Sequence, residues 1–399
     1  MKRAAVLGST GSVGAQALDV LDRLGGAYEV VALAAGHRSD AFAAQVQRWR
    51  PELAALGAEE PPDLVIGDVP ILCGPDALDR LVERVAPDLL LLATPGLVGL
   101  TACLRTLRGG RMVAIANKES LVAAGHLVTR AAQEHQGTII PVDSEHSGIW
   151  QCLSGEDVAS VTGIVLTSSG GAFRDTLVED LDRATPEQAL RHPTWSMGPK
   201  ITVDSATLMN KGLEIIEATW LFGVPASMVS VVLHRQSIVH ALVEFSDGSV
   251  KAQLSVPDMR IPIVNALMYP DRVSVGLPRL DIPTLGSLTF EPLDVERYPA
   301  LRLARTAAQS GGTCPAVLNA ANDVAVDRFL GGEIRFTDIV PLVAETLQRH
   351  DRLLDRAAGD ELVHGNRPIL ADAMRAIGSL ILDRRVPPRV HVDHIVGSR

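Results

Sequence analysis

Short apolar runs alternate with longer amphipathic segments over the first 140 residues of the chain. The apolar runs predict strands at residues 4–7, 30–34, 64–66, 89–93, 112–116 and 138–142. Several runs are apolar throughout, which is typical of parallel strands buried on both faces and separated by helices such as 15–24. We therefore predict an α/β fold that begins with a doubly wound, Rossmann-like parallel sheet.

The pattern changes after residue 142. Strand-like runs at 160–167, 229–233, 241–245 and 250–254, with a helix after Asp204, predict an α+β domain. Four prolines between 270 and 297 indicate an extended linker. Helical spacing at 316–330, 339–347 and 369–382 then predicts a C-terminal helical bundle. The expected division of the chain is 1–142, 143–268, a linker at 269–297, and 298–399.

Composition indicates a folded protein, in which any anionic ligand must be bound by a local basic pocket. The chain has 399 residues, 47% of them hydrophobic, and a formal charge of -10, which argues against binding nucleic acid or an anionic membrane. No stretch approaches the roughly 20 apolar residues that a bilayer span requires. The cysteines are few and widely spaced, which predicts neither disulfides nor a zinc site and fits a reducing cytoplasm.

The motif GSTGSVG occupies residues 8–14, between the first predicted strand and the first predicted helix. Glycines at such a junction allow a tight turn and the close approach of a pyrophosphate, whose charge meets free backbone N–H groups and the helix dipole. A glycine motif alone is a weak signal. Its position after the first strand makes a dinucleotide the favoured ligand.

The end of the second predicted strand bears on which dinucleotide this is. An NAD site would place an acid near Ala35 to bind the ribose hydroxyls, whereas this chain continues with Gly36, His37, Arg38 and Ser39. Two potential cations and a hydroxyl suit the 2′-phosphate of NADPH. The alternative is an exposed loop that happens to carry an arginine and a histidine.

Polar residues follow the fifth and sixth predicted strands. Asn117, Lys118 and Glu119 end the fifth, and Asp143 and Glu145 follow the sixth. We expect both groups at the carboxyl edge of the sheet, where ligands of such folds bind. In extended backbone, the carboxylates of Asp143 and Glu145 would project from one face and repel each other unless a cation or a partner base made the arrangement favourable. A polar strand end is the alternative.

A second group lies in the helix expected after Asp204, a residue of the kind that caps helices. Asn210, Lys211 and Glu214 fall on neighbouring faces there and offer an amide, an ammonium and a carboxylate. A surface ion pair between Lys211 and Glu214 is the alternative. Gly212 inside a helix costs roughly 1 kcal/mol against alanine, so it indicates a close backbone approach.

Two loops complete the candidate site. The segment TSSGGAF at 167–173 follows a strand, and its small hydroxyl residues and paired glycines suit a phosphate-binding nest, with an ordinary loop as the alternative. The segment RHPTWSMGPK at 191–200 combines chain-breaking residues with a tryptophan and a methionine. Such a segment either closes over a ligand as a lid or anchors an irregular loop.

Taken in order, these stretches resemble the 1-deoxy-D-xylulose-5-phosphate reductoisomerase family of the non-mevalonate isoprenoid pathway. The matching segments run from residue 8 to 326 and read GSTGSVG, ANKESLV, VDSEHS, TSSGGAFR, RHPTWSMGPKITVDSATLMNKGLEIIEA, HRQSIVHALVEF, DGSVKAQLSVPDMR and VLNAANDVAV. The resemblance implies an N-terminal NADPH domain, a connective catalytic domain and a C-terminal helical domain, assembled as a homodimer.

The resemblance also implies the roles of individual residues. Asp143, Glu145 and Glu214 would bind Mg²⁺, Mn²⁺ or Co²⁺, as suits a hard cation. The substrate would contact Ser144, Glu145, Ser169, His192, Trp195, Met197, Ser205, Asn210, Lys211, Glu214 and His240. NADPH would contact Thr10, Gly11, Ser12, Val13, Gly36, His37, Arg38, Asn117, Lys118, Glu119, Gly198 and Met259. The catalytic residues would be Asp143, Glu145, His192, Lys211 and Glu214, with Lys211 either meeting phosphate charge or donating a proton.

The implied reaction starts from the sugar phosphate 1-deoxy-D-xylulose 5-phosphate. A metal-assisted retro-aldol and aldol rearrangement would give a branched aldehyde, which NADPH would reduce to 2-C-methyl-D-erythritol 4-phosphate. Two other hypotheses stay open at this point. A generic NADPH-dependent two-domain dehydrogenase needs no acid cluster, and a non-catalytic NADPH-sensing module needs neither the acids nor the lid.

Overall fold

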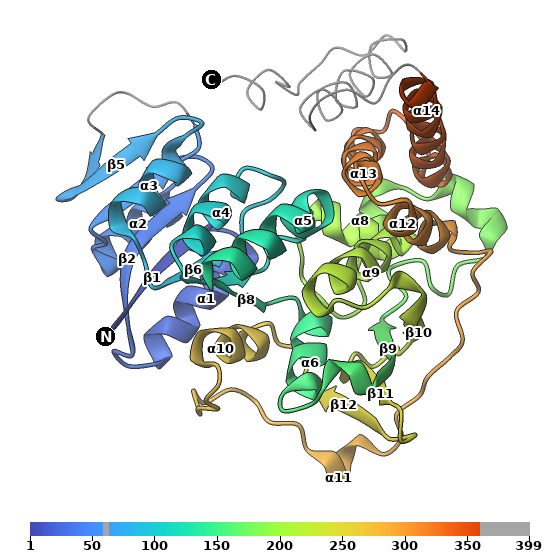
Figure 1. Cartoon of the computed structure of the whole chain (residues 1–399), viewed down its shortest axis with the longest axis horizontal. Helices are drawn as coiled ribbons and strands as arrows, with labels where there is room; N and C mark the ends of the chain where they lie inside the picture. Colours follow the sequence, from blue (N-terminus) through green and yellow to red (C-terminus); the bar gives the residue numbers. More distant parts are fainter. Residues whose placement is uncertain (59–63, 360–399) are drawn as a thin grey trace. The chain divides into compact units, whose positions relative to one another are not determined.

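The computed structural model describes residues 1–58 and 64–359, so the helix predicted at 369–382 lies outside the described residues. Contacts divide the chain into two compact units, which are traced along the sequence in Figure 1. The first unit contains Met1–Ser169 and Glu217–Pro292, and the second contains Gly170–Ile216 and the residues from Leu293 onward. Each unit therefore combines two separate stretches of chain. The division into three domains and a linker stays a prediction.

The first unit is built on an eight-stranded sheet in the order β4-β5-β3-β2-β1-β6-β7-β8. Neighbouring strands are parallel except for the β4–β5 pair, which is antiparallel. The strands are β1 (Lys2–Leu7), β2 (Tyr28–Ala35), β3 (Leu53–Leu56), β4 (Val65–Ile66), β5 (Val69–Cys73), β6 (Leu89–Leu92), β7 (Met112–Ile115) and β8 (Thr138–Pro141). The order reverses at β1, as a doubly wound sheet requires, so the predicted fold class is confirmed.

One part of this sheet differs from the prediction. The strand predicted at 64–66 is only the two-residue β4, and both β3 and β5 were missed. Strand β3 reads Leu-Ala-Ala-Leu, and alanine is depleted in strands, so its pattern resembles a helix turn. Strand β5 contains Pro70, which lowers the strand signal of any sequence window around it.

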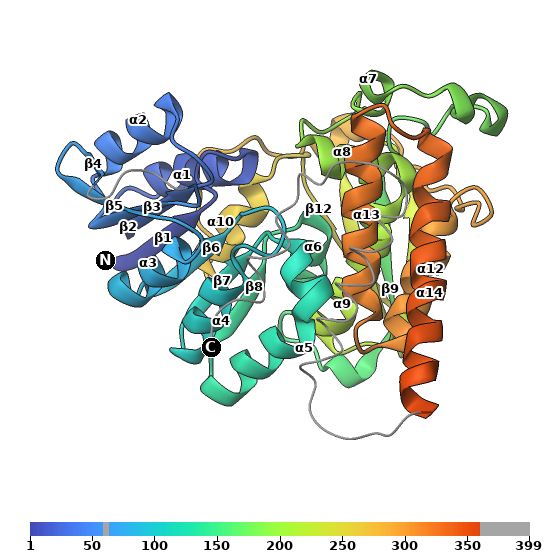
Figure 2. The same cartoon turned by 90° about the horizontal axis from the view of Figure 1, so that it is seen from above.

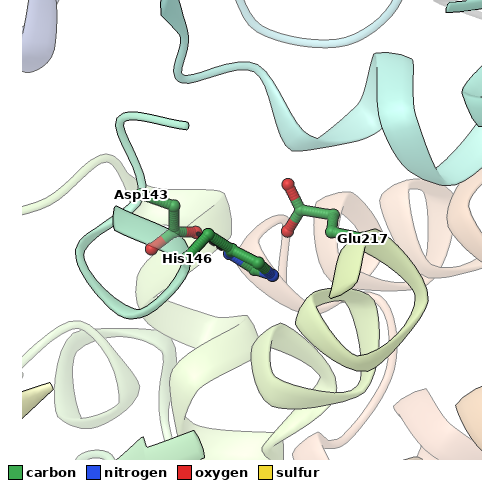
Figure 3. Close-up of side chains that lie close together, drawn as sticks. All are labelled: Asp143, His146 and Glu217. Atoms are coloured by element: carbon green, nitrogen blue, oxygen red, sulfur yellow. Dashed lines mark ion pairs between the residues drawn. The ribbon is translucent and has the colours of Figure 1, made fainter. Parts of the chain in front are cut away.

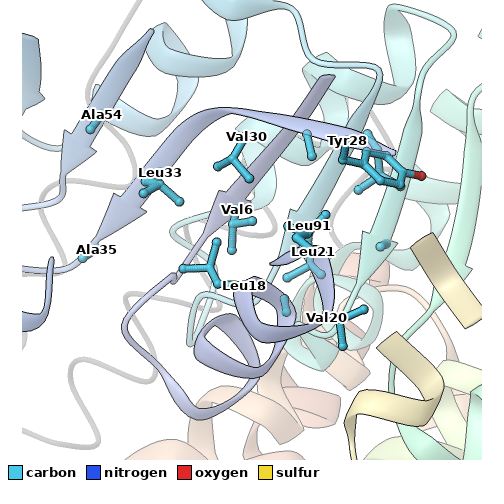
Figure 4. Close-up of a cluster of buried hydrophobic side chains, with 14 of the residues drawn as sticks. Val6, Leu18, Val20, Leu21, Tyr28, Val30, Leu33, Ala35, Ala54 and Leu91 are labelled. Atoms are coloured by element: carbon cyan, nitrogen blue, oxygen red, sulfur yellow. The ribbon is translucent and has the colours of Figure 1, made fainter. Parts of the chain in front are cut away.

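Helices cover both faces of this sheet. The side chain of Val6 packs with Leu18 and Leu21 of α1 (Ser12–Arg23) in one buried cluster, which Figure 4 shows. Its neighbours Ala5 and Leu7 point the other way, into a cluster with α3 (Ala77–Val85), α4 (Leu100–Arg108) and α5 (Lys118–His135). Successive strand residues face opposite sides, so uniformly apolar strands bury both faces. Helices α2 (Asp40–Trp49) and α10 (Arg260–Met268) pack on the face of α1.

The first unit also contains a four-stranded sheet in the order β10-β9-β11-β12. Its strands are β9 (Val161–Ser168), β10 (Val229–Leu233), β11 (Val239–Phe245) and β12 (Val250–Leu254), close to the four predicted runs. Helix α6 (Ser144–Leu153) packs on β11 and β12. The first unit also contains three short elements, which are the 3-10 helices η1 (Val158–Ser160) and η3 (Ala226–Met228) and the α-helix α11 (Ile282–Leu285).

The second unit is helical. Helices α12 (Pro299–Ser310), α13 (Cys314–Leu330) and α14 (Ile339–Gly359) lie side by side, as Figure 2 shows. The unit also contains η2 (Val178–Arg183), α7 (Pro186–Ala189), α8 (Pro199–Thr207), η4 (Phe336–Asp338) and the start of α9 (Met209–Phe222). A Cβ added at Gly212 would lie 2.8 Å from the Cβ of Ala304 in α12, so the predicted close approach at this glycine is real.

No described helix has both the length and the apolar character needed to cross a membrane.

Candidate active site

The glycine turn connects β1 to α1 through two close backbone contacts. Gly8 has a φ of +84°, and a Cβ at Gly14 would lie 2.1 Å from the carbonyl oxygen of Gly8. The turn is held to β2, because the N–H groups of Gly8 and Ser9 both donate to the carbonyl of Ala34 at 2.9 Å. Gly11 is the N-cap of α1 and makes no side-chain capping bond, so the first N–H groups of the helix remain available for an anion.

The candidate 2′-phosphate loop follows β2. Gly36, His37 and Arg38 are exposed. The hydroxyl of Ser39 accepts a hydrogen bond from the N–H of Phe42 at 3.2 Å and so caps the N-terminus of α2. Ser39 therefore has a structural role, while the two potential cations lie just before a helix N-terminus, which itself favours an anion.

The local geometry expected for Asp143 and Glu145 is wrong. Strand β8 ends at Pro141, Asp143 is the N-cap of α6, and Glu145 lies in the first turn of that helix, so the two acids do not share an extended strand. The reason is that the segment Asp-Ser-Glu-His has the composition of a helix start, with a capping residue followed by an acid in the first turn. Glu145 is half-buried, and its Oε2 accepts a hydrogen bond from the hydroxyl of Ser144 at 2.5 Å.

A buried ionic cluster surrounds Asp143 within the first unit. The Nζ of Lys118 lies 2.6 Å from Oδ2 of Asp143 and 3.6 Å from Oε2 of Glu217. His146 is fully buried, and its Nδ1 lies 4.0 Å from the same Asp143 oxygen. Figure 3 shows Asp143 and His146, from the start of α6, and Glu217, from α9, converging. Burial raises the pKa of Glu217, and the positive charge of Lys118 opposes that rise.

Asn117 organises the loop next to this cluster. Its Oδ1 accepts from the N–H of Ser120 at 3.0 Å and caps α5. Its Nδ2 donates to the carbonyls of Thr94 and Gly96, at 2.8 and 2.7 Å, and to Oε2 of Glu119 at 2.9 Å. Asn117 is thus buried and ties the loops after β6 and β7 together, and Glu119 is half-buried beside it.

The second unit contains the other predicted ionic group. Lys211 donates to both carboxylate oxygens of Glu214, at 2.9 and 2.7 Å, and Asn210 donates to Oε1 at 2.6 Å. Lys211 is 5% exposed and Glu214 is fully buried, so the alternative of a surface pair is wrong. A buried ion pair that adds little to stability by itself is more common at a functional site than in a core.

The expected capping role of Asp204 is also wrong. Asp204 lies inside α8 and is fully buried. Its carboxylate forms an ion pair with Lys200 at 2.8 Å and accepts a hydrogen bond from the Nδ2 of Asn322 in α13 at 2.7 Å. Pro199 starts this helix earlier than the sequence pattern indicated, because proline is favoured in the first turn. The network fixes α8, and with it Ser205, against α13.

His192 joins the predicted lid to α8. Its Nδ1 accepts from the backbone N–H groups of Thr194 and Trp195, at 3.1 and 2.8 Å, and its Nε2 lies 3.1 Å from the hydroxyl of Ser205. Because two donors point at Nδ1, the proton of the neutral ring is assigned to Nε2, which donates to Ser205. Trp195 and Met197 are half-buried, and Gly198 is the N-cap of α8.

The paired glycines of the predicted phosphate-binding nest both have a left-handed backbone, which favours glycine, and the nest itself stays a prediction. Gly170 and Gly171 have φ values of +84° and +69° in succession. A Cβ at Gly171 would lie 2.5 Å from the carbonyl oxygen of Ser205, so the loop packs directly on α8. Ser169, just before them, is half-buried.

His240 lies in the first unit on a small pocket whose lining includes Ser144, Ser255 and Asp258. Its Nε2 is 2.9 Å from the hydroxyl of Ser255. Ser144 and His240, both predicted substrate contacts, therefore share one pocket. Met259 is the N-cap of α10 and packs against the apolar cluster below α1.

A doubly wound sheet with a glycine turn at its first strand-to-helix junction defines a dinucleotide-binding protein. The buried ion pair of Lys118 and Asp143 at the ligand edge of this sheet is typical of an enzyme.

Comparisons with known proteins give the family. Family models described as 1-deoxy-D-xylulose 5-phosphate reductoisomerase match residues 4–125, and its C-terminal domain models match 139–222 and 254–364. The reductoisomerase of Heliobacterium modesticaldum is 48% identical over 88% of this chain and 91% of its own length. That of Symbiobacterium thermophilum is 50% identical over 88% and 92%.

Solved structures agree with these matches. The Zymomonas mobilis reductoisomerase in complex with NADPH has a TM-score of 0.84 at 38% identity and covers 96% of this chain and all of its own. A reductoisomerase in complex with NADPH, fosmidomycin and magnesium has a TM-score of 0.83 at 35% identity and covers 96% and 99%. The chain belongs to the 1-deoxy-D-xylulose 5-phosphate reductoisomerase family. The predicted family and the predicted function, an oxidoreductase and isomerase of isoprenoid precursor synthesis, are confirmed.

Sequence reasoning assigned no role to several residues that shape the site. Glu217 and His146 complete the cluster at Asp143, and Asn322 holds Asp204. Glu217 carried a signal, because it lies one helical turn after Glu214 within an otherwise apolar stretch of α9. The sequence around Asn322 contains no such signal, because its partner Asp204 is 118 residues away along the chain.

Proposed function

We propose that this chain binds NADPH and a divalent cation and uses them to convert 1-deoxy-D-xylulose 5-phosphate to 2-C-methyl-D-erythritol 4-phosphate. Family membership supports both ligands, because solved relatives are described in complex with NADPH and with magnesium. The observation that carries the proposal is the buried ion pair of Lys211 and Glu214, because such a pair adds little to stability and is often found at a functional site.

For the cation we propose Asp143, Glu145 and Glu214 as ligands. All three offer carboxylate oxygens, which suit Mg²⁺ or Mn²⁺. Asp143 and Glu145 start α6, where an N-cap and a first turn leave acids half-exposed. Glu214 lies on α9, one turn before Glu217, whose carboxylate converges with that of Asp143.

For NADPH we propose the glycine turn and the loops after the neighbouring strands. The exposed start of α1 would receive the pyrophosphate, and the loop after β2 would receive the 2′-phosphate. The contacts proposed are Thr10, Gly11, Ser12, Val13, Gly36, His37, Arg38, Asn117, Lys118, Glu119, Gly198 and Met259.

For the sugar phosphate we propose one group of residues that binds its phosphate and a second group that contacts the rest of the molecule. The phosphate would meet the hydroxyl of Ser205, the ring of His192 and the ammonium of Lys211, with the α8 network holding Ser205 in place. Further contacts would be Ser144, Glu145, Ser169, Trp195, Met197, Asn210, Glu214 and His240.

When bound, the cation supplies a Lewis acid for the rearranging oxygens and NADPH supplies the hydride for the reduction. The chain's own residues would position the substrate and exclude water from the site. Lys211, between phosphate charge and Glu214, is suited to hold a proton close to the substrate. Trp195 and Met197, half-buried on an irregular segment, would shield the site from water once His192 draws that segment toward Ser205.

NADPH oxidation with 1-deoxy-D-xylulose 5-phosphate tests the proposal. Asp143→Asn should lower kcat/KM about 1,000-fold or more, because Lewis-acid stabilisation is worth several kcal/mol. Asp157→Asn is the matched control, since Asp157 is exposed and asparagine also caps η1. Full activity of Asp143→Asn would contradict the metal assignment, and turnover of a simple keto substrate in EDTA would favour a generic dehydrogenase.

We also propose a cytoplasmic homodimer. The free state of all four cysteines supports a reducing compartment. Strand β12 is an edge strand of the four-stranded sheet, and an edge offers backbone groups to a second copy. Light scattering coupled to size exclusion should give twice the chain mass of 42.5 kDa, and a value near the single mass would contradict the dimer.

A further inference from the structure

A side-chain amide from α2 reaches the turn between β1 and α1. The Nε2 of Gln45 donates to the carbonyl oxygen of Ser9 at 2.9 Å. Gln45 is half-buried and lies three residues after Phe42 and next to Val46, both of which are fully buried in the apolar cluster of α1. It therefore lies at the edge of the buried face of α2, where an amide is an unusual choice.

The hydrogen bond to Ser9 leaves part of this amide unsatisfied. A carbonyl oxygen only accepts, so the nitrogen of Gln45 must face Ser9 and its Oε1 must face elsewhere. Oε1 is buried and accepts no hydrogen bond from a described residue. Burying an unsatisfied oxygen costs at least as much as one neutral hydrogen bond returns. The stability of the fold does not by itself account for an amide at this position.

The same hydrogen bond fixes one peptide plane of the turn. The N–H of Ser9 donates to the carbonyl of Ala34 in β2, so β2 holds the peptide before Ser9 and Gln45 holds the peptide after it. The peptide bond between Ser9 and Thr10 is trans, and a planar trans peptide directs its N–H opposite to its C=O. Because this carbonyl points to α2, the N–H of Thr10 points away from α2.

The N–H of Thr10 is available to a ligand. Thr10 is exposed, and its N–H donates to no other described residue. It lies directly before Gly11, the N-cap of α1, where free N–H groups favour an anion. A donor that is already fixed binds an anion more tightly than a mobile one, because less conformational freedom is lost on binding.

We infer that Gln45 is a positioning residue that aims the N–H of Thr10 at the pyrophosphate of NADPH. The inference rests on the proposed binding of that pyrophosphate at the glycine turn. NADPH and NADH share the pyrophosphate, whereas the 2′-phosphate belongs to NADPH alone. Loss of the Gln45 amide should therefore weaken the binding of both dinucleotides by the same factor.

Cofactor affinity of the full chain without substrate tests this inference, with NADPH titrated by fluorescence and NADH by saturation-transfer NMR. Gln45→Met keeps the length and the helix propensity of the side chain but removes the donor. It should raise both dissociation constants about tenfold, as expected when one hydrogen bond to a charged group is weakened, and should lower the Tm of the cofactor-free chain by a few degrees at most. Gln47→Met is the matched control, because Gln47 is exposed on the same helix, and it should leave both constants unchanged.

Three results would overturn the inference. One is wild-type affinity of Gln45→Met for both dinucleotides, since the turn would then fix the Thr10 N–H by itself. Another is a loss confined to NADPH, which would mean that Gln45 acts through the loop proposed for the 2′-phosphate. The third is an equal loss in Gln47→Met, which would mean that any change in α2 disturbs the turn.

A second variant serves if Gln45→Met fails to fold. Gln45→Asn keeps an amide that is one methylene shorter and so withdraws it from Ser9. It should weaken both dinucleotides as Gln45→Met does, and wild-type affinity would overturn the inference. Failure of the wild-type chain to bind NADPH would instead refute the proposed cofactor site itself.

Discussion

Gly14→Ala tests whether the turn between β1 and α1 is as tight as the structure shows. The new Cβ would lie 2.1 Å from the carbonyl oxygen of Gly8, 2.7 Å from the Cα of Ser9 and 2.8 Å from the carbonyl carbon of Gly8. All three atoms are backbone, so no side chain can rotate away. Reaching an ordinary contact distance requires α1 and the turn to separate by about 1 Å.

Two effects on stability oppose each other in this variant. Alanine gains about 1 kcal/mol of helix propensity over glycine, and overpacking costs about 1–3 kcal/mol. The net loss of folding free energy should therefore be small, about 0–2 kcal/mol, with a correspondingly small fall in Tm. The effect on NADPH should be larger, since a displacement of about 1 Å at a binding site can cost about 100-fold.

Titration of NADPH fluorescence and a thermal melt measure the two effects separately. We expect the dissociation constant of NADPH to rise about 100-fold, while Tm changes by only a few degrees. Gly331→Ala is the control, because its Cβ would meet only ordinary contacts, the nearest at 3.4 Å, and none of them is a proposed NADPH contact. Wild-type NADPH affinity in Gly14→Ala would refute the reasoning, because it would show that the turn relaxes without moving the helix start.

Three further predictions concern other parts of the chain. The Arg260 guanidinium holds the pKa of Asp258 below its ordinary value, so this pair stabilises the fold above the unfolded pKa of about 3.9 and loses its effect as pH falls toward the lower folded value. Arg260→Gln should thus cost about 1 kcal/mol in urea unfolding at pH 7 and much less near pH 3, and a constant difference would contradict the pairing. Asn322→Ala should cost about 2 kcal/mol in the same assay, because it removes a partner of the fully buried Asp204, and an unchanged midpoint would contradict that role. Of the four cysteines only Cys73 is not buried, so a thiol reagent at pH 8 should label one site in the native protein and none in Cys73→Ser; labelling of further thiols would contradict the burial.

Much of the first unit could be predicted because its signals are local. The uniformly apolar strands and the glycine turn both result from short-range chemistry, and both lie along the chain close to where the sequence predicted them. The short strand at Leu53–Leu56 could not be predicted, because its alanines become a strand only by pairing between β2 and β5. Tertiary pairing, rather than propensity, decides such a segment.

The candidate site, too, could be predicted only in part from the sequence. Acids at a strand end could be predicted to lie at the ligand edge, but the turn that places Asp143 and Glu145 at the start of α6 depends on where β8 stops. The spacing of Lys211 and Glu214 predicted that the two side chains are neighbours on a helix. Their burial depends on the packing of that helix, which the spacing does not reveal. Glu217 acquires its partners from α5 and α6, elements that no pattern within α9 could reveal.

The most direct test of the central claim is the identity of the product together with the amount of NADPH consumed. With Mg²⁺ present, we expect each 1-deoxy-D-xylulose 5-phosphate that disappears to yield a 2-C-methyl-D-erythritol 4-phosphate, observed by NMR, and to oxidise an equal amount of NADPH. With EDTA, both changes should stop. Oxidation of NADPH without the branched product, or product formation that continues in EDTA, would contradict the account.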